Sequence, residues 1–354
     1  MKQNYLKPNF GVGIYLPEQV LTNEDFEKNN ITLKSGRKLI ASQILEKIGI
    51  ERRHIAGESE TVADMGYLAA RDALPKNKQT YLDLVIASSS HPTEYHVARE
   101  IAKRLNLKKV EALDIHAACS GSALMFSHIF DNQKKLQGKT VLLIASEKFS
   151  STVVDLTRPD ALDLDSSLGQ TIFGDGAAAI NFVVGKDIAI HYALNKELPE
   201  ASGKTDLIYM AMGDNQFIQP CFVHPVSSLQ KSSDFPDGYF VQNGPKVFEV
   251  IQNTIPGIIR DVVEKAGFSS RDIDLVVVHP GSKRLVDALR EKLAPDFEVY
   301  SLYEDGNISS VSLLYSFIKA LQSGRIGRGS KVVLSGFGAG SPDLYSSTVV
   351  IELL

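Results

Sequence analysis

The chain of 354 residues has no tryptophan, only two cysteines, and no hydrophobic run long enough to cross a bilayer. The two cysteines, Cys119 and Cys221, cannot build a disulfide framework and fit a reducing compartment. The first residues form no signal-peptide core, so we expect a cytoplasmic protein without a membrane segment. A net charge of −4 lacks the basic excess typical of nucleic-acid binding. These absences argue against secreted, membrane-spanning and nucleic-acid-binding classes.

The composition is that of a globular protein with a large core. Hydrophobic residues make up 44% of the chain and charged residues 23%, which is an ordinary balance for such proteins. A chain of this length can form one large domain or two of medium size. The two alternatives are separated by a repeat within the sequence.

A constant offset of 191 residues relates two parts of the chain. Asp-Leu-Val-Ile at 83–86 corresponds to Asp-Leu-Val-Val at 274–277. Val-Leu-Leu at 141–143 corresponds in the same way to Val-Val-Leu at 332–334. A period this long indicates a duplicated domain, because solenoid repeats are much shorter.

Within each half, apolar strands alternate with helical patterns, which predicts a layered α/β fold. The runs 84–86 and 276–278 are apolar on both faces, as central strands covered by helices on both sides must be. We expect two pseudo-equivalent halves, 1–185 and 186–354. The stretch 195–243 breaks the pattern with proline, glycine and polar residues, so we interpret it as an inserted cap or long loop.

Cys119 lies at a predicted turn between a strand at 109–115 and a helix that begins near residue 122. A helix N-terminus favours thiolate over thiol, so this position suits a nucleophile. The alternative is a small buried hydrophobic residue, which describes many cysteines outside disulfides. This segment alone does not separate the two interpretations.

Two polar residues are placed by the repeat near Cys119. His279 ends a buried strand and is the repeat mate of Ser88, while Asn307 precedes Ser310, the mate of Cys119. Ligand sites in α/β sheets lie at the carboxyl ends of strands, so we expect the three side chains to converge. The alternatives are a structural hydrogen bond for the histidine and a helix N-cap for the asparagine.

Neither a metal nor a nucleotide cofactor is expected. Cys221 and His224 could supply half of a zinc site, but the sequence offers no second pair. The glycine-rich run at 336–341 follows a strand without a subsequent βαβ unit, so it does not indicate dinucleotide binding.

Several motifs together resemble the thiolase superfamily, specifically β-ketoacyl-acyl carrier protein synthase III and its relatives. The resemblance extends over nearly the whole chain and implies a duplicated thiolase-like fold in five α-β-α-β-α layers. The motifs that carry it are YLPEQVLTN at 15–23, GIERR at 49–53, DIHAACSG at 114–121, FGDGAAA at 173–179, GNISS at 306–310 and GFGAGS at 336–341.

The resemblance implies a decarboxylative Claisen condensation. Cys119 would accept an acyl group from a thioester, and His279 and Asn307 would stabilise the enolate formed from a malonyl- or β-ketoacyl-type thioester. Backbone N–H groups of Cys119 and of the loop Gly338–Gly340, above all that of Ala339, would hold the oxyanion. Substrates would be thioesters of acyl carrier protein or coenzyme A, with no cofactor.

The resemblance also implies a homodimer and places three further residues. Tyr95 would reach into the partner's acyl pocket, and Ser341 would form part of the pocket wall. Arg284 matches an arginine that contacts carrier protein in the family, although a solvated helix face is an equal interpretation.

Departures from the family pattern favour a condensing enzyme of secondary metabolism over the starter enzyme of fatty acid synthesis. No tryptophan is present where acetyl-CoA-primed members stack adenine, which favours a carrier-protein donor, and the histidine motif is His-Pro-Gly-Ser at 279–282. Two alternatives remain: acyl transfer without decarboxylation, with His279 as base, and a catalytically silent partner subunit. The presence of Asn307 argues against the first, and that of Cys119 against the second.

Overall fold

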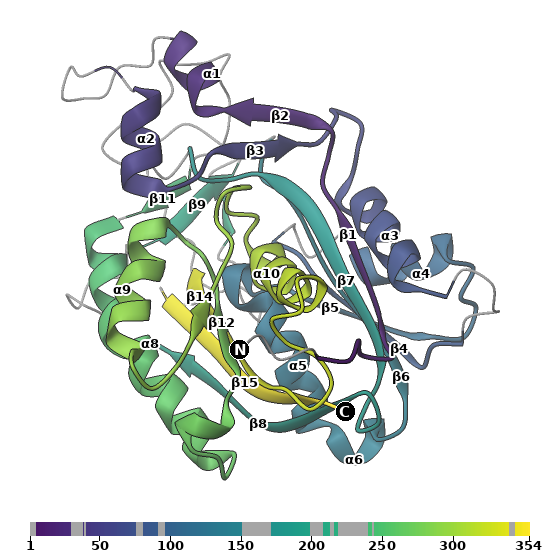
Figure 1. Cartoon of the computed structure of the whole chain (residues 1–354). Helices are drawn as coiled ribbons and strands as arrows, with labels where there is room; N and C mark the ends of the chain where they lie inside the picture. Colours follow the sequence, from purple (N-terminus) through teal and green to yellow (C-terminus); the bar gives the residue numbers. More distant parts are fainter. Residues whose placement is uncertain are drawn as a thin grey trace.

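Two five-stranded sheets form the framework of the protein (Figure 1). The computed structural model describes residues 5–29, 38, 40–75, 81–90, 96–150, 171–198, 244–339 and 344–354, and the backbone alone at 208–212, 216–218, 240–242 and Ala339.

The two sheets have the same strand order and the same strand directions. The first has the order β1-β7-β6-β4-β5 and the second β8-β15-β14-β12-β13. In each, the fourth strand runs parallel to its two neighbours, and the second runs antiparallel to the strands beside it. The predicted duplicated fold is therefore confirmed. The first sheet comprises β1 (Gly11–Tyr15), β4 (Leu84–Ser88), β5 (Glu111–Ile115), β6 (Thr140–Lys148) and β7 (Asp175–Val183), and the second β8 (Ile188–Glu197), β12 (Leu275–Val278), β13 (Val299–Tyr300), β14 (Lys331–Ala339) and β15 (Leu344–Leu353).

Helices lie between the sheets and on their outer faces, which gives five layers (Figure 1). Two helices share the central core with strands of both sheets, two pack on the outside of the first sheet, and two on the outside of the second. In the same order these pairs are α5 (Gly121–Asp131) with α10 (Ser310–Gln322), α3 (Val62–Ala73) with α4 (Val97–Arg104), and α8 (Gly244–Lys265) with α9 (Lys283–Leu293).

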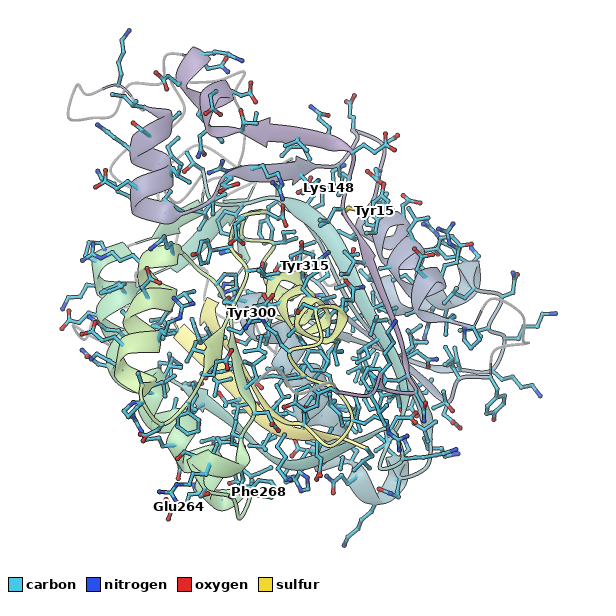
Figure 2. All side chains as sticks on the ribbon, viewed as in Figure 1. Tyr15, Lys148, Glu264, Phe268, Tyr300 and Tyr315 are labelled. Atoms are coloured by element: carbon cyan, nitrogen blue, oxygen red, sulfur yellow. The ribbon has the colours of Figure 1, made fainter. Side chains whose placement is uncertain are left out.

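The side-chain pattern explains which helix occupies which layer. Helix α10 buries ten of its thirteen residues, because both faces meet a sheet; Tyr315 on it is labelled in Figure 2. Helix α3 instead presents small alanines to β1 and β7. A Cβ added to Gly13 would lie 2.0 Å from the carbonyl oxygen of Ala69, so this contact requires glycine.

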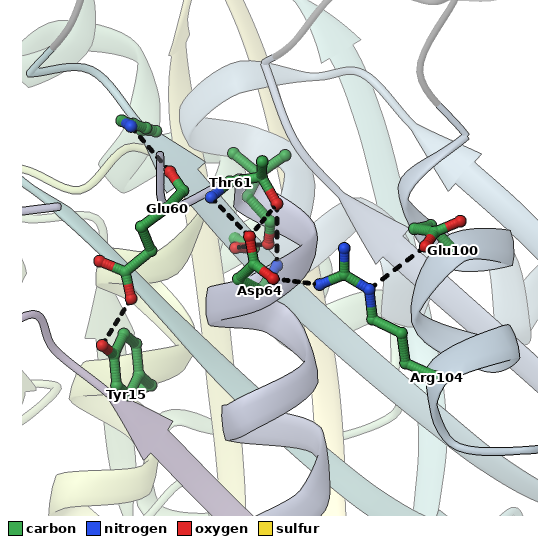
Figure 3. Close-up of polar contacts among 9 residues, drawn as sticks. Tyr15, Glu60, Thr61, Asp64, Glu100 and Arg104 are labelled. Carbon is green, nitrogen blue, oxygen red and sulfur yellow. Dashed lines mark hydrogen bonds and ion pairs between the residues drawn. The ribbon is translucent and has the colours of Figure 1, made fainter. Parts of the chain in front are cut away.

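Polar contacts fix the start of α3 and join it to α4 (Figure 3). The hydroxyl of Thr61 accepts a hydrogen bond from the Asp64 N–H, and the Asp64 carboxylate accepts one from the Thr61 N–H, which forms a capping box. Asp64 and Glu100 both pair with Arg104 of α4. The two outer helices therefore dock on the sheet as one unit.

The other strands and helices lie outside the two five-stranded sheets and the six helices that pack on them. The sequence predicts a cap or loop over 195–243, but residues 195–197 continue β8 of the second sheet. The described part of 208–242 contains three short strands that form a separate sheet. Among the described helices, none is both long and apolar enough to span a bilayer. The remaining elements are β2 (Gln19–Thr22), β3 (Arg52–Ile55), β9 (Ile208–Met212), β10 (Gln216–Ile218), β11 (Phe240–Gln242), α1 (Asn23–Lys28), α2 (Ala41–Ile48), α6 (Gln133–Leu136), η1 (Ala118–Ser120) and η3 (Ser270–Asp272).

Candidate active site

The three predicted catalytic residues are buried in segments that connect a strand to the next long helix. Cys119 is in η1, between β5 and α5, and is 9% exposed. His279 directly follows β12 and is 2% exposed, while Asn307 precedes α10 and is 4% exposed. The first residue comes from one half of the duplicated fold and the other two from the second half.

The loop of Asn307 is held against the first half and carries a second polar side chain to the thiol. The backbone N–H of Asn307 donates to the carbonyl of Ile172 at 2.7 Å, and its carbonyl accepts from the Gly174 N–H at 3.1 Å. Its side-chain oxygen accepts from the Ser309 N–H at 2.8 Å, which leaves the NH2 group as the part of the amide able to donate. The Ser309 hydroxyl lies 3.7 Å from the Cys119 sulfur.

Consecutive residues of strand β14 contact Cys119 and His279. A Cβ added to Gly338 would lie 2.8 Å from the Cβ of Cys119 and 3.1 Å from its sulfur. The preceding residue, Phe337, packs edge-to-face on the His279 ring with 5.8 Å between centroids. Ala339 ends this strand, whereas the predicted Gly340 lies outside the described residues.

His279 is a buried neutral imidazole. Its backbone N–H donates to the Ser335 carbonyl at 2.9 Å, and its Nδ1 has no hydrogen-bond partner among the described residues. Burial lowers the pKa of His279 to about 3, because no described carboxylate compensates for the lost water. The ring can therefore donate a hydrogen bond from a neutral N–H at physiological pH.

The expectation that the helix terminus keeps Cys119 as a thiolate is wrong for the free protein. Burial raises the pKa of the thiol to about 12, and hydrogen bonds from Ser309 and Asn307 oppose this only in part, while the charge of Glu147 adds to it. Burial therefore favours the protonated thiol over the thiolate at neutral pH. A helix terminus supplies only about 0.3–1 kcal/mol, or about 2 in partly buried sites, so desolvation dominates.

Glu147 is a residue of this neighbourhood that the sequence interpretation missed. It lies near the end of β6, is fully buried, and accepts hydrogen bonds from the hydroxyls of Ser90 at 3.1 Å and Ser310 at 2.7 Å. Burial raises the pKa of Glu147 to about 7. In the sequence, the one feature that could have indicated Glu147 is that its carboxylate closely follows the apolar run 141–145.

Backbone strain is also concentrated here. Three described residues other than glycine have a positive φ, and two of them flank the thiol: Ala118, with φ 38°, and Ser309, with φ 46°. Such conformations cost about 1–3 kcal/mol each and cluster at functional sites. The observation supports a functional interpretation of the Cys119 region.

The outlying predicted site residues are placed only in part. Tyr95 and Ser341 lie outside the described residues. Arg284 is exposed on the first turn of α9, where its guanidinium lies 4.8 Å above the ring of Phe248. Its role towards carrier protein stays a prediction.

Comparisons with known proteins agree with the motifs. The chalcone and stilbene synthase N-terminal domain model matches residues 41–188, and the 3-oxoacyl-[acyl-carrier-protein] synthase III C-terminal model matches 263–346. The chain is similar to the β-ketoacyl-[acyl-carrier-protein] synthase III of Methylococcus capsulatus, with 30% identity over 336 residues, 93% of this chain and 94% of the relative.

Solved structures show the same fold. The 3-oxoacyl-[acyl-carrier-protein] synthase III of Aquifex aeolicus superposes with a TM-score of 0.74 and 28% identity, covering 98% of this chain and all of that one. The priming β-ketosynthase of the R1128 polyketide pathway superposes with a TM-score of 0.73 at 24% identity, covering 98% and 97%, and at that identity shows the shared fold alone. Because its curated relative matches over nearly the full length of both chains, this chain belongs to the β-ketoacyl-[acyl-carrier-protein] synthase III family, as its motifs predicted.

Proposed function

We propose that the protein catalyses a decarboxylative Claisen condensation between an acyl thioester and a malonyl- or β-ketoacyl-type thioester. The observation that carries the proposal is that β14 contacts both of the buried residues Cys119 and His279, and that Ser309 of the Asn307 loop contacts the same thiol. Family membership supports an acyl-transferring enzyme.

In the first half-reaction the Cys119 sulfur attacks the thioester carbonyl. A new C–S bond forms, the bond to the carrier sulfur breaks, and the carrier leaves as a thiol after taking up a proton. Backbone N–H groups of Cys119 and Ala339 would hold the oxyanion, which fits the position of Ala339 next to Gly338. Glycine at 338 is required because a side chain there would collide with the nucleophile.

In the second half-reaction His279 and Asn307 act together on the extender. The neutral imidazole and the asparagine NH2 group would donate hydrogen bonds to the extender's thioester oxygen. As the C–C bond to the carboxylate breaks and CO2 leaves, that oxygen gains charge, and each donor lowers the barrier by about 3 kcal/mol. The enolate carbon then attacks the acyl carbonyl and frees Cys119 as a thiolate.

The experiment is intact-protein mass spectrometry after mixing the wild type and Cys119→Ala with acyl thioesters of increasing chain length. The panel contains both coenzyme A and carrier-protein forms. We expect an adduct of the acyl mass on the wild type and none on the variant, followed by loss of that adduct when an extender thioester is added. If no donor acylates the wild type, the proposal is wrong and a silent subunit is favoured.

We further propose a cytoplasmic homodimer that uses carrier-protein-bound donors in secondary metabolism. The absence of tryptophan from the chain supports this donor class, and the small number of cysteines supports the compartment. Light scattering on the purified protein should give twice the chain mass of 38.8 kDa. A mass of one chain would contradict the dimer and with it the crossover role of Tyr95.

A further inference from the structure

Two serine hydroxyls connect the Cys119 thiol to a buried carboxylate. The Cys119 S–H donates to the Ser309 hydroxyl at 3.7 Å, and the Ser309 and Ser90 hydroxyls are 3.5 Å apart. The Ser90 hydroxyl in turn donates to Oε1 of Glu147 at 3.1 Å. Every step can be oriented in the same direction, from the thiol towards the carboxylate.

From this chain of contacts we infer that Glu147 is the base for Cys119 and acts through the hydroxyls of Ser309 and Ser90. This inference rests on the proposed function, because it concerns the proton that the thiol must lose to attack an acyl donor. Glu147 would not touch the substrate, so it is a positioning and proton-accepting residue behind the nucleophile.

The burial of Glu147 is hard to explain as structural support alone. It is fully buried, and the structure shows no ion pair to it among the described residues. Glu147 also accepts from the Ser90 N–H at 2.8 Å, the Ser310 hydroxyl at 2.7 Å and the Ser310 N–H at 3.4 Å. A buried carboxylate without a cation is costly, and hydrogen bonds to it meet that cost only in part.

The surroundings set the protonation behaviour of this carboxyl group. Burial raises the pKa of Glu147 to about 7, which is the range in which a base is most effective near neutral pH. Because the Cys119 thiol has a pKa of about 12, it is protonated at neutral pH and must lose its proton during attack. A nearby proton acceptor would therefore lower the barrier to attack by Cys119.

The titratable and charged groups that face Glu147 come from several neighbouring elements. Across the sheet, Glu147 pairs with Gly176, and the next pair is Lys148 with Asp175. Lys148 donates to backbone carbonyls of residues 57, 58 and 60, while Asp175 accepts from backbone N–H groups. At the end of β4, the His116 ring contacts the Ser89 carbonyl. On the α10 side the neighbours are serines, and His279 remains neutral above its pKa of about 3.

Protons balance over the full cycle. During acylation the thiol proton passes along the two hydroxyls to the Glu147 carboxylate, while the departing carrier thiolate takes one proton from solvent. During condensation CO2 leaves without a proton, and Cys119 departs from the acyl group as a thiolate. Glu147 then returns the stored proton to the thiolate, so each turnover consumes one solvent proton per CO2 released.

The test uses p-nitrophenyl acetate, a small activated acyl donor that requires neither carrier recognition nor an extender. The first-turnover rate of Cys119 acetylation is followed from pH 6 to 9 by p-nitrophenolate release, and the modified peptide is identified by mass to separate Cys119 from Cys221. We expect the wild-type rate to rise through about pH 7 and then level off. Glu147→Gln should lower the plateau by about 10²- to 10⁴-fold and abolish the levelling.

The opposite sign is expected if Glu147 acts only through its charge. Its negative charge raises the pKa of Cys119, so its removal would then increase the thiolate fraction and accelerate acetylation. A Glu147→Gln rate equal to or above that of the wild type would therefore overturn the inference. So would a wild type that shows no burst at all. A burst without later condensation would instead contradict only the proposed function.

Two serines provide a matched pair for the relay path. Both donate to the same carboxylate oxygen, but Ser90 lies between Glu147 and Ser309, whereas Ser310 does not. Ser90→Ala should slow acetylation at least tenfold, and Ser310→Ala should keep the levelling, shifted to higher pH because the carboxylate loses a donor. Equal rates for the two variants would overturn the relay path. Thermal unfolding and alkylation by iodoacetamide confirm that each variant is folded and its thiol accessible.

Discussion

The contact between Gly338 and Cys119 gives the sharpest steric prediction. A methyl group at position 338 would lie 2.8 Å from the Cys119 Cβ and 3.1 Å from its sulfur, closer than ordinary van der Waals contact. The strand cannot retreat easily, because β14 is paired with both β12 and β15. Overpacking of this kind costs about 1–3 kcal/mol. If the thiol is displaced from its reactive position, acylation slows by a factor of about 5 to 150.

The assay compares Gly338→Ala with Gly257→Ala. Gly257 is exposed within α8, and a methyl group there has no neighbour within 4 Å, so the control adds the same atom without a clash. An exposed glycine-to-alanine change in a helix stabilises by about 1 kcal/mol. We therefore expect slow acylation and a lowered melting temperature for Gly338→Ala alone. Acylation of Gly338→Ala at the wild-type rate would refute the proposed packing of β14 on the nucleophile.

Three further variants test Asn307, His279 and Asp305. Asn307→Asp keeps the acceptor for the Ser309 N–H but loses the NH2 donor, so acylation should persist while condensation falls about a hundredfold, measured by product formation. Burial lowers the pKa of His279 to about 3, so the unfolded state binds a proton before the folded state as pH falls below 6.5. Between pH 7.5 and 5 the free energy of unfolding of the wild type, measured in urea, should therefore fall by about 2 kcal/mol more than that of His279→Gln. Asp305 is buried, but His54, Tyr315 and Arg52 outweigh the burial and lower its pKa to about 2. Asp305→Asn should therefore lose about 2 kcal/mol at pH 7, a difference that disappears as pH falls below 3.8 towards 2. An unchanged condensation rate in Asn307→Asp, the same pH dependence in His279→Gln as in the wild type, or unchanged stability of Asp305→Asn at pH 7 would contradict the argument for that residue.

The central strands and the position of Cys119 were predictable because both follow from local pattern. Strands β4 and β12 are apolar on both faces, and a helix covers each side of the sheet that contains them. The repeat placed His279 and Asn307 because equivalent turns of a duplicated fold lie at equivalent sheet edges. Pattern and symmetry therefore sufficed for these residues.

The charge state of the site was not predictable, because it depends on which segments cover the thiol. Gly338 lies 219 positions after Cys119 in the chain, yet its strand closes over the sulfur and removes water from it. In the sequence, Glu147 is a polar residue near the end of a predicted strand, as is common for solvent-exposed strand ends. Its hydrogen bonds to Ser90 and Ser310 depend on two segments far from it in the sequence, so only the fold reveals them.

The measurement that tests the central claim most directly is the stoichiometry of CO2 release. Purified protein is loaded with one acyl equivalent and then mixed with a malonyl thioester labelled in its free carboxylate. The account predicts one labelled CO2 and one β-ketoacyl thioester for each acyl group lost from Cys119, with neither product formed by Cys119→Ala. Loss of the acyl group to an oxygen or nitrogen acceptor without CO2 release would contradict condensation and establish plain acyl transfer.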